Sequence, residues 1–447
     1  HKFLIMSSDN DDKWPDGAKK AITAQFLGFF MDAYDLMLVT AMLPILAKVF
    51  ASPTVSALTA YLTVLAGYAV SLLFRPVGSA IFGNFGDKIG RRKTLMYTIT
   101  GFSVMSALTA LIPTYAAIGV WSFIIFTIFR MIQGIFIGGE YAAGHPFAME
   151  FAKKNRRGLV SGIVQSGFTW GVALSGFIVT GFYHLFGPTG MLDVGWRWAF
   201  VTGLIPFVIV IFIRYFMPDS PLFEEIKNEN KIEKVPFFTI FKPPVLYTFL
   251  QVFVLMVGLF FSSWSMFNAT TGILTGAGLT AGDAALWYAI GGIFAAISAI
   301  SWGFASDFIG RRRAFLIGAI ITFVLSIPVY YFLYTAAHEK NYLYLVFAVL
   351  LEGLLTQWVW GLVPAYLSER FGTQRRASGV GFGYSSGLFV SGWMPIFMML
   401  LVGPFKGIQG TNLWFTAAFF LLLASILYGI GAYIGPETKD IDLRKIN

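Results

Sequence analysis

The sequence predicts an all-α membrane protein, in which twelve transmembrane helices form two six-helix bundles that repeat in the same orientation. Three observations predict this fold class: the composition is strongly apolar, the apolar residues fall in twelve long runs, and a charged motif recurs halfway along the chain. An apolar run of about 20 residues is long enough to cross a bilayer as a helix.

The composition separates this chain from soluble proteins. Hydrophobic residues make up 57% of the 447 residues, charged residues make up 12%, and the mean hydropathy is +0.71. Soluble domains carry about 25% charged residues, so we expect the chain to lie within a lipid bilayer. Cysteine is absent, which excludes disulfides and cysteine-based metal sites. We expect no metal and no cofactor.

The twelve runs define the predicted domains. Residues 1–19 are polar, lack the pattern of a signal peptide, and are interpreted as a cytoplasmic tail. Six spans are predicted in the first bundle, over 20–217: 20–48, 55–84, 92–112, 117–151, 158–184 and 197–217. A charged connector over 218–244 follows. Six more spans are predicted in the second bundle, over 245–434: 245–272, 281–306, 312–336, 341–369, 377–403 and 409–434. Residues 435–447 form a second cytoplasmic tail.

The two halves carry matching motifs. The stretch GNFGDKIGRRK begins at Gly83, and GFASDFIGRRR begins at Gly303 at the corresponding place in the second half. Glu150 and Arg156 similarly match Glu369 and Arg375. Because each half has an even number of spans, both copies lie on one side of the membrane, as in transporters built from parallel repeats.

The positive charges predict the orientation. Of the 32 Lys and Arg residues, only Lys48, Arg197, Lys340 and Lys406 fall in one set of alternate loops, whereas most of the others fall in the termini and the other loops. Positive residues collect on the cytoplasmic side of membrane proteins. We therefore expect a cell-membrane protein with both termini in the cytoplasm, and we expect no nucleic-acid partner despite the net charge of +9.

The repeated motif resembles the signature G-x-x-x-D-R/K-x-G-R/K-R/K of the major facilitator superfamily. Gly83, Asp87, Lys88, Gly90, Arg91 and Arg92 match it, and Phe308 replaces the Lys88 equivalent in the second copy. FRPVGSAIFGNFGDKIGRR, MDAYDL and GGEYAAGHPFAMEF resemble the metabolite:proton symporter and sialate/lactate:proton symporter families. The resemblance covers nearly the whole chain and implies alternating access between two rocking bundles. We expect a functional monomer whose partners are the bilayer, protons and a small-molecule substrate.

Charged side chains inside the spans are candidates for function, because their burial in a bilayer is costly. Asp32 and Asp35 are three residues apart and so share one helix face. Two close carboxylates in a low dielectric favour retention of a proton on one of them. We hypothesise that Asp35 carries the proton and that Arg130 is its partner, since Arg130-x-x-Gln133-Gly134 resembles the R-x-x-Q-G element of the family. A static buried ion pair is the alternative.

The other charged groups in the spans leave two interpretations each. Arg75 either contacts an anion or gates the cytoplasmic end, or else reaches the interface or pairs with Glu140. Glu140 and Glu352 are further candidates for proton coupling. His145 is either structural or a pH sensor.

By family analogy the cavity is lined by spans one, four, seven and ten, with contributions from two, five, eight and eleven. The predicted substrate-binding residues are Arg130, Gln133, Gln165, Trp264, Asn268, Gln357, Trp358 and Tyr384; Trp170, Ser262 and Ser263 are also candidates. Such a lining suits either a small anion neutralised by Arg130 or a neutral sugar.

The repeated motifs are predicted to form a cytoplasmic latch. Asp87 and Asp307 are placed to cap helices of the other half, and arginines are placed to bind carboxylates or lipid phosphates. The predicted latch residues are Gly83, Asp87, Arg91, Arg92, Glu150, Arg156, Gly303, Asp307, Arg311, Arg312, Glu369 and Arg375. Setting the topology is the alternative role for the arginines.

The sequence thus predicts proton-coupled symport of a small organic acid, of the monocarboxylate, sialate-like or aromatic class. A sugar or phosphate symporter, or a transport-inactive sensor on the same fold, is the alternative. The chain contains no G-x-x-x-x-G-K-S/T motif for an ATP-driven pump and no clustered nucleophile and base for an enzyme.

Overall fold

The computed structural model describes residues 13–230, 232 and 236–446. These residues form helices and turns, with no β-strand among them. Most of the predicted N-terminal tail, and residues 231 and 233–235 of the predicted connector, lie outside the described residues.

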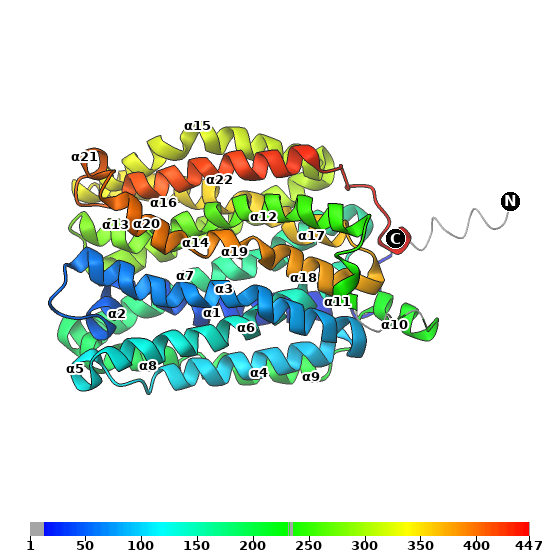
Figure 1. The fold of residues 1–447 in the computed structure, drawn as a ribbon, viewed down its shortest axis with the longest axis horizontal. Helices are drawn as coiled ribbons and strands as arrows, with labels where there is room; N and C mark the ends of the chain where they lie inside the picture. The colour runs from blue at the N-terminus through cyan, green and yellow to red at the C-terminus, as the bar shows by residue number, and fades with distance from the viewer. Residues whose placement is uncertain (1–12, 231, 233–235, 447) are drawn as a thin grey trace.

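The first half of the chain forms one bundle, shown from blue to green in Figure 1. Its helices are α1 (Ala18–Ala41), α2 (Leu43–Phe50), α3 (Ala57–Ile89), α4 (Arg91–Thr109), α5 (Tyr115–Ile118), α6 (Val120–Glu150), α7 (Arg157–Gly190), α8 (Trp196–Val201) and α9 (Leu204–Tyr215). The predicted connector contains α10 (Pro221–Asn228) and α11 (Pro236–Thr239).

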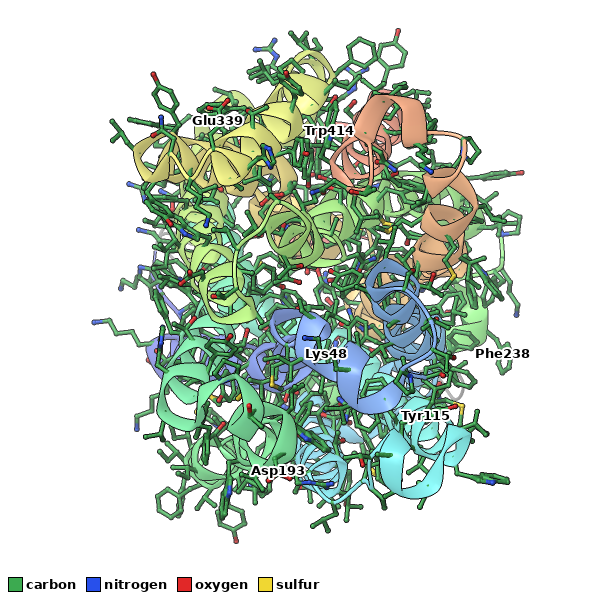
Figure 2. All side chains as sticks on the ribbon, turned by 90° about the vertical axis from the view of Figure 1, so that its left-hand side faces the viewer. Lys48, Tyr115, Asp193, Phe238, Glu339 and Trp414 are labelled. Carbon is green, nitrogen blue, oxygen red and sulfur yellow. The ribbon has the colours of Figure 1, made fainter. Side chains whose placement is uncertain are left out.

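The second half forms the other bundle. Its helices are α12 (Val245–Phe267), α13 (Thr270–Gly276), α14 (Ala281–Ile309), α15 (Arg311–His338), α16 (Tyr342–Gln357), η3 (Trp358–Leu362), α17 (Val363–Ser368), α18 (Arg376–Ser386), α19 (Leu388–Ser391), α20 (Met394–Val402), α21 (Lys406–Gln409) and α22 (Trp414–Ile434). Figure 2 looks along the helices and places Lys48, Tyr115 and Asp193 in one half of the molecule and Glu339 and Trp414 in the other.

Long helices of the two bundles pack directly against each other. Helix α7 packs along α14, and α3 packs along α18. We call the end where α1 begins and α10 and α11 lie the terminal end, and the end with α2, α5, α13 and α21 the opposite end (Figure 1). The functional residues described below lie at this interface or inside one of the bundles.

Among the described residues, ten helices are long and apolar enough to cross a membrane. The other two predicted spans correspond to α4 and to the α8–α9 pair. Helix α4 begins with the basic residues Arg91, Arg92 and Lys93, which lower its mean hydropathy, and the sixth span is divided between Val201 and Leu204.

The repeated motif forms the same tight turn in both bundles. Gly90 lies between α3 and α4 with φ of 104°, and Gly310 lies between α14 and α15 with φ of 96°. A side chain is strained at such positive φ values, whereas glycine is not. Glycine at these two positions therefore lets each pair of helices meet at the terminal end without a longer loop.

Candidate functional site

A closed cavity lies between the two bundles. The space between its atoms amounts to about 350 Å³, of which only a small part admits a water-sized sphere. Helices of both halves contribute to it, and its lining residues are Arg75, Gln165, Phe168, Thr169, Phe260, Ser263, Trp264, Ala299, Gln357, Trp360 and Tyr384. The lining is thus mainly aromatic and amide-bearing, and it contains a single charged side chain and no carboxylate.

Arg75 on α3 supplies that charge. Its side chain is only 3% exposed, and the guanidinium carbon lies 5.5 Å from the centre of the Trp264 ring. The Nε and Nη2 atoms are buried without a hydrogen-bond partner. The interpretation that Arg75 pairs with Glu140 is wrong, because Glu140 is bound by Arg214. An unpaired buried guanidinium is energetically costly unless an anion joins it.

Several predicted binding residues line this cavity and others do not. Gln165, Trp264, Gln357 and Tyr384 line it, whereas Arg130, Gln133, Asn268 and Trp358 do not. The chain leaves the α-helical path at η3, so that Trp360 faces the cavity. Trp358 instead stacks on Trp302, with ring centres 4.9 Å apart.

Arg130 and Asp35 lie deeper inside the first bundle. Arg130 donates a hydrogen bond to Thr109 and packs against Phe126 and Phe200, while its Nε and Nη1 atoms have no partner. Asp35 lies against Gly203, and its Oδ1 atom is likewise without a partner. The predicted partners interact electrostatically but are not joined by an ion pair within 4.0 Å.

Asp32 faces a different group although it shares a helix with Asp35. It belongs to a buried cluster with Glu140 on α6 and Arg214 on α9. Arg214 is not among the residues predicted from the sequence, because its charge was attributed to the cytoplasmic side. Its position after the apolar run LIPFVIVIFI was the available signal that it lies within a span.

Two further candidates, Glu352 and His145, are buried outside the cavity lining. Glu352 on α16 is fully buried, and both of its carboxylate oxygens lie 3.0 Å from the Thr270 hydroxyl. His145 on α6 contacts Gln25 through Nδ1, at 3.2 Å, and its ring stacks on Tyr141. Neither side chain lines the cavity.

The opposite end is closed by polar contacts between the bundles. The Tyr61 hydroxyl on α3 donates to the carbonyl of Asn268, at 2.8 Å, and the hydroxyls of Thr40 and Tyr288 lie 2.6 Å apart. Asn268 follows the last residue of α12, where the seventh span is interrupted before α13. The predicted substrate residue Asn268 therefore contributes its backbone to this closure.

The terminal end is closed by the first copy of the repeated motif. The carboxylate of Asp87 accepts hydrogen bonds from the backbone N–H groups of Ala377, at 3.1 Å, and Ser378, at 2.8 Å, and from the Ser378 hydroxyl, at 2.7 Å. These groups form the first turn of α18 in the other bundle. A carboxylate is favourable there because the N-terminal end of a helix is electropositive.

The second copy makes the equivalent contact. Asp307 accepts from the backbone N–H groups of Gly158, at 2.8 Å, and Leu159, at 2.9 Å, in the first turn of α7. The motif glycines allow the approach: a Cβ atom at Gly303 would lie 2.6 Å from the carbonyl oxygen of Gly158. A Cβ atom at Gly83 would lie 3.1 Å from the carbonyl oxygen of Ala377.

Ion pairs cross between the bundles beside both motifs. Glu150 is bound by Arg91, at 3.1 Å, and by Arg376 of the other bundle, at 2.9 Å. Glu369 is bound by Arg311, at 2.9 Å, and by Arg157 of the other bundle, at 2.6 Å. Arg157 and Arg376, which make these crossing ion pairs, directly follow the predicted Arg156 and Arg375 in the sequence. Arg156 lies over the rings of Phe304 and Phe308 on α14 of the other bundle.

The second arginine of each motif stays within its own bundle. Arg92 donates to the carbonyl of Tyr215, at 2.7 Å, and Arg312 donates to that of Tyr433, at 2.8 Å. Asp219 accepts from the backbone N–H of Arg91, at 3.1 Å, and burial raises the pKa of the Asp219 carboxyl above its ordinary value. These contacts tie α4 and α15 to the last helix of each bundle.

Comparisons with known proteins agree with this architecture. The chain matches the family described as "Sugar (and other) transporter" over residues 20–234 and again over 223–447. It is 27% identical to a shikimate transporter of Escherichia coli, covering 94% of this chain and 95% of that protein. It is 26% identical to the sialic acid transporter NanX of the same species, covering 92% and 93%.

Solved structures show the same fold. The proton:xylose symporter XylE bound to a bromodeoxyglucose superposes with a TM-score of 0.75 at 18% identity, covering 96% of this chain and 98% of that one. A partially occluded, inward-open form of the xylose transporter XylE from E. coli gives a TM-score of 0.69 at 20% identity, covering 95% and 99%. The fold, the repeated motif and the family match lead to one conclusion: the chain belongs to the sugar (and other) transporter family of the major facilitator superfamily, and is a multi-pass membrane transporter of the sugar or metabolite type.

Proposed function

We propose that this protein is a proton-coupled symporter of a small organic acid, and that Arg75 binds the carboxylate of the substrate. One observation carries the proposal: Arg75 is buried in the central cavity with two of its nitrogens unpartnered, and no carboxylate lines that cavity. The distribution of Lys and Arg supports a cytoplasmic position for the terminal end.

The chemistry of the cavity favours a carboxylate over a neutral sugar. A carboxylate accepts two parallel hydrogen bonds from a guanidinium and neutralises it, whereas a sugar would leave the buried charge of Arg75 uncompensated. The rings of Phe260, Trp264 and Trp360 suit the apolar body of the substrate, and Gln165 and Gln357 suit its hydroxyl or amide groups. Shikimate and sialic acid, named in the relatives above, are both carboxylic acids.

Proton coupling is assigned to Asp35. Its unpartnered Oδ1 lies in a buried site that also holds unpartnered nitrogens of Arg130, so a proton on Asp35 would weaken its attraction to Arg130. Tyr68 connects this site to the cavity: its ring packs against Trp264, with centres 5.9 Å apart, and its hydroxyl is within electrostatic reach of both Arg75 and Arg130. Protonation of Asp35 is thus expected to favour binding of an anion at Arg75.

A thermal-shift panel on purified protein tests the substrate class. The panel contains shikimate, sialic acid and lactate as carboxylates, methyl shikimate and xylose as neutral compounds, and inorganic phosphate as a different anion. A ligand at 100 times its Kd stabilises the native state by about 2.7 kcal/mol. We expect at least one carboxylate to raise Tm, and to raise it more at about pH 6 than at about pH 8. Methyl shikimate should not raise Tm.

Replacement of Arg75 tests the residue. Arg75→Gln removes charged hydrogen bonds worth about 1.5–3 kcal/mol, so the affinity for the carboxylate should fall about 10- to 100-fold. The control is Lys48→Gln, which removes an exposed positive charge at the opposite end and should leave the affinity unchanged. Stabilisation by xylose alone, or equal carboxylate affinity in Arg75→Gln and the native protein, would overturn the proposal.

A further inference from the structure

Two carboxylates and one arginine are buried together inside the first bundle, away from the central cavity. Arg214 on α9 binds both carboxylate oxygens of Glu140 on α6: Nη1 donates to Oε2 at 2.9 Å, and Nη2 donates to Oε1. The Thr98 hydroxyl on α4 donates to the same Oε2 atom, at 3.3 Å. Glu140 is 0% exposed and Arg214 is 2% exposed. This pair is therefore neutral and largely satisfied on its own.

Asp32 adds a second carboxylate to the pair. It is 1% exposed and lies within electrostatic range of both Glu140 and Arg214, while its Oδ2 atom has no partner. Two neighbouring carboxylates in a buried site cannot both stay ionised without a large electrostatic penalty. With only one cation beside them, a bound proton makes the cluster neutral.

The packing holds Arg214 in this position. A Cβ atom at Gly28, one turn before Asp32 on α1, would collide with the guanidinium of Arg214. The absence of a side chain at Gly28 thus lets α9 place its arginine directly against the backbone of α1. Asp32, Glu140 and Arg214 are thus held together by the packing of three separate helices, α1, α6 and α9.

Few other titratable or charged groups lie near Asp32 on the helices packed against α1. Asp35 lies on the same helix and adds negative charge, which also favours a bound proton. His145 of α6 contacts Gln25 of α1 rather than the carboxylates. Arg92 of α4 is the next cation toward the terminal end, and its side chain is tied to the carbonyl of Tyr215.

A small cavity continues from the cluster toward the terminal end. It is lined by Ala24, Gln25, Arg92, Leu95, Phe147, Arg214 and Met217. Its volume suits about one water molecule. A proton leaving the cluster past Arg214 would meet this cavity, with the partly exposed Arg92 at its lining, without entering the central cavity.

We propose that Asp32 and Glu140 together form a second proton-binding site, distinct from Asp35, which exchanges its proton with the terminal end through the cavity beside Arg92. In the protonated state an O–H of one carboxyl donates to the other carboxylate, and Arg214 balances the remaining negative charge. Loss of the proton leaves one excess negative charge near Asp35. The coupling of this site to transport rests on the proton symport proposed above, but proton binding itself does not.

Infrared difference spectroscopy of the protein in liposomes, without any organic acid, tests the site. A protonated carboxyl has a C=O band that shifts in D2O and disappears when the group ionises. We expect Asp32→Asn and Glu140→Gln each to remove the same one-carboxyl band at neutral pH. Each variant keeps one acid beside Arg214, so both should fold. The matched controls Glu225→Gln and Asp193→Asn, on the connector and at the opposite end, should leave the band unchanged.

The variants separate this inference from the proposed function. If Asp35→Asn alone removes the band, the proton belongs to Asp35 and the second site is wrong, while proton symport stands. If both single variants keep the band, Asp32 and Glu140 hold no proton and the inference is likewise overturned. The double variant Asp32→Asn/Glu140→Gln leaves Arg214 without an acidic partner, so we expect its Tm to fall well below that of either single variant, and Arg214→Gln in that background to restore it.

Discussion

Asp35 is the residue on which proton coupling depends in the proposed scheme. Its carboxylate and the guanidinium of Arg130 each keep a buried atom without a hydrogen-bond partner. Protonation of Asp35 would therefore directly change the electrostatic interaction between the two side chains. Removing the charge of Asp35 permanently should uncouple the proton from the substrate but leave the central cavity unaltered, because Asp35 does not line it.

We expect Asp35→Asn to exchange substrate across a membrane but to lose accumulation on a pH gradient. With one proton per substrate, a gradient of one pH unit supports about tenfold accumulation. Uptake of labelled shikimate, or of whichever carboxylate stabilises the protein, should be measured in proteoliposomes with and without the gradient. Undiminished accumulation by Asp35→Asn would exclude it as the proton carrier.

Individual residues also show where prediction from sequence ends. Charge within an apolar run was enough to select Asp32, Asp35, Arg75 and Arg130 as candidates. It did not determine which arginine faces the cavity, because that depends on how each helix is rotated against its neighbours. Because Arg75 lines the cavity and Arg130 does not, we propose Arg75 as the residue that binds the substrate.

At the scale of elements, helix contacts between the bundles depend on small residues in the repeated motif. Gly303 on α14 lies against the backbone of α7 and of η3: a Cβ atom there would be 2.6 Å from the oxygen of Gly158 and 2.8 Å from that of Gly361. Backbone atoms cannot rotate away as a side chain can. A methyl group at this position must push the helices apart.

We therefore expect Gly303→Ala to weaken closure at the terminal end and to destabilise this conformation by about 1–3 kcal/mol, as overpacking does. Thermal unfolding of purified protein measures the loss. Gly181→Ala on α7 is the matched control, since no atom lies within 4 Å of its Cβ position, and it should be neutral or slightly stabilising. Equal stability of the two variants would argue against the packing role of Gly303.

The sequence predicted the transmembrane helices better than the places where a helix begins or changes its winding. The repeat placed Asp87 and Asp307 where each could cap a helix of the other half, because a fixed offset implies the same position in both bundles. The 3₁₀ turn at η3 has no comparable signal, and it places Trp360 rather than Trp358 in the cavity. Arg157 and Arg376 make the crossing ion pairs, whereas the sequence predicted the preceding residues, Arg156 and Arg375. Which of the two adjacent arginines crosses depends on the residue at which α7 and α18 begin.

At the scale of the whole molecule, the cavity is closed at both ends. Asp87 and Asp307 hold the terminal end, and Tyr61 and Thr40 hold the opposite end. A substrate can reach Arg75 only after one of these closures opens, as alternating access requires. The chain contains no cysteine, so a single introduced thiol reports on the cavity without background.

We expect Ser263→Cys, in the cavity lining, to react slowly with a membrane-impermeant maleimide. Adding Tyr61→Phe removes the hydrogen bond to the Asn268 carbonyl, worth about 0.5–1.5 kcal/mol, and should raise the labelling rate about 2- to 10-fold from the side of the opposite end. Tyr97→Phe, a lipid-facing control that is 62% exposed, should not. A rate unaffected by Tyr61→Phe would show that this contact does not limit opening.

The reciprocal ion pairs at the terminal end have a consequence for membrane tightness. Arg376 crosses to Glu150 in one direction, and Arg157 crosses to Glu369 in the other. The two ion pairs act in parallel, so either one alone still opposes separation of the bundles at the terminal end. A cell that stores energy in a proton gradient loses it through any continuous water path. Because the motif is duplicated, breaking one of these ion pairs does not by itself open a water path at the terminal end.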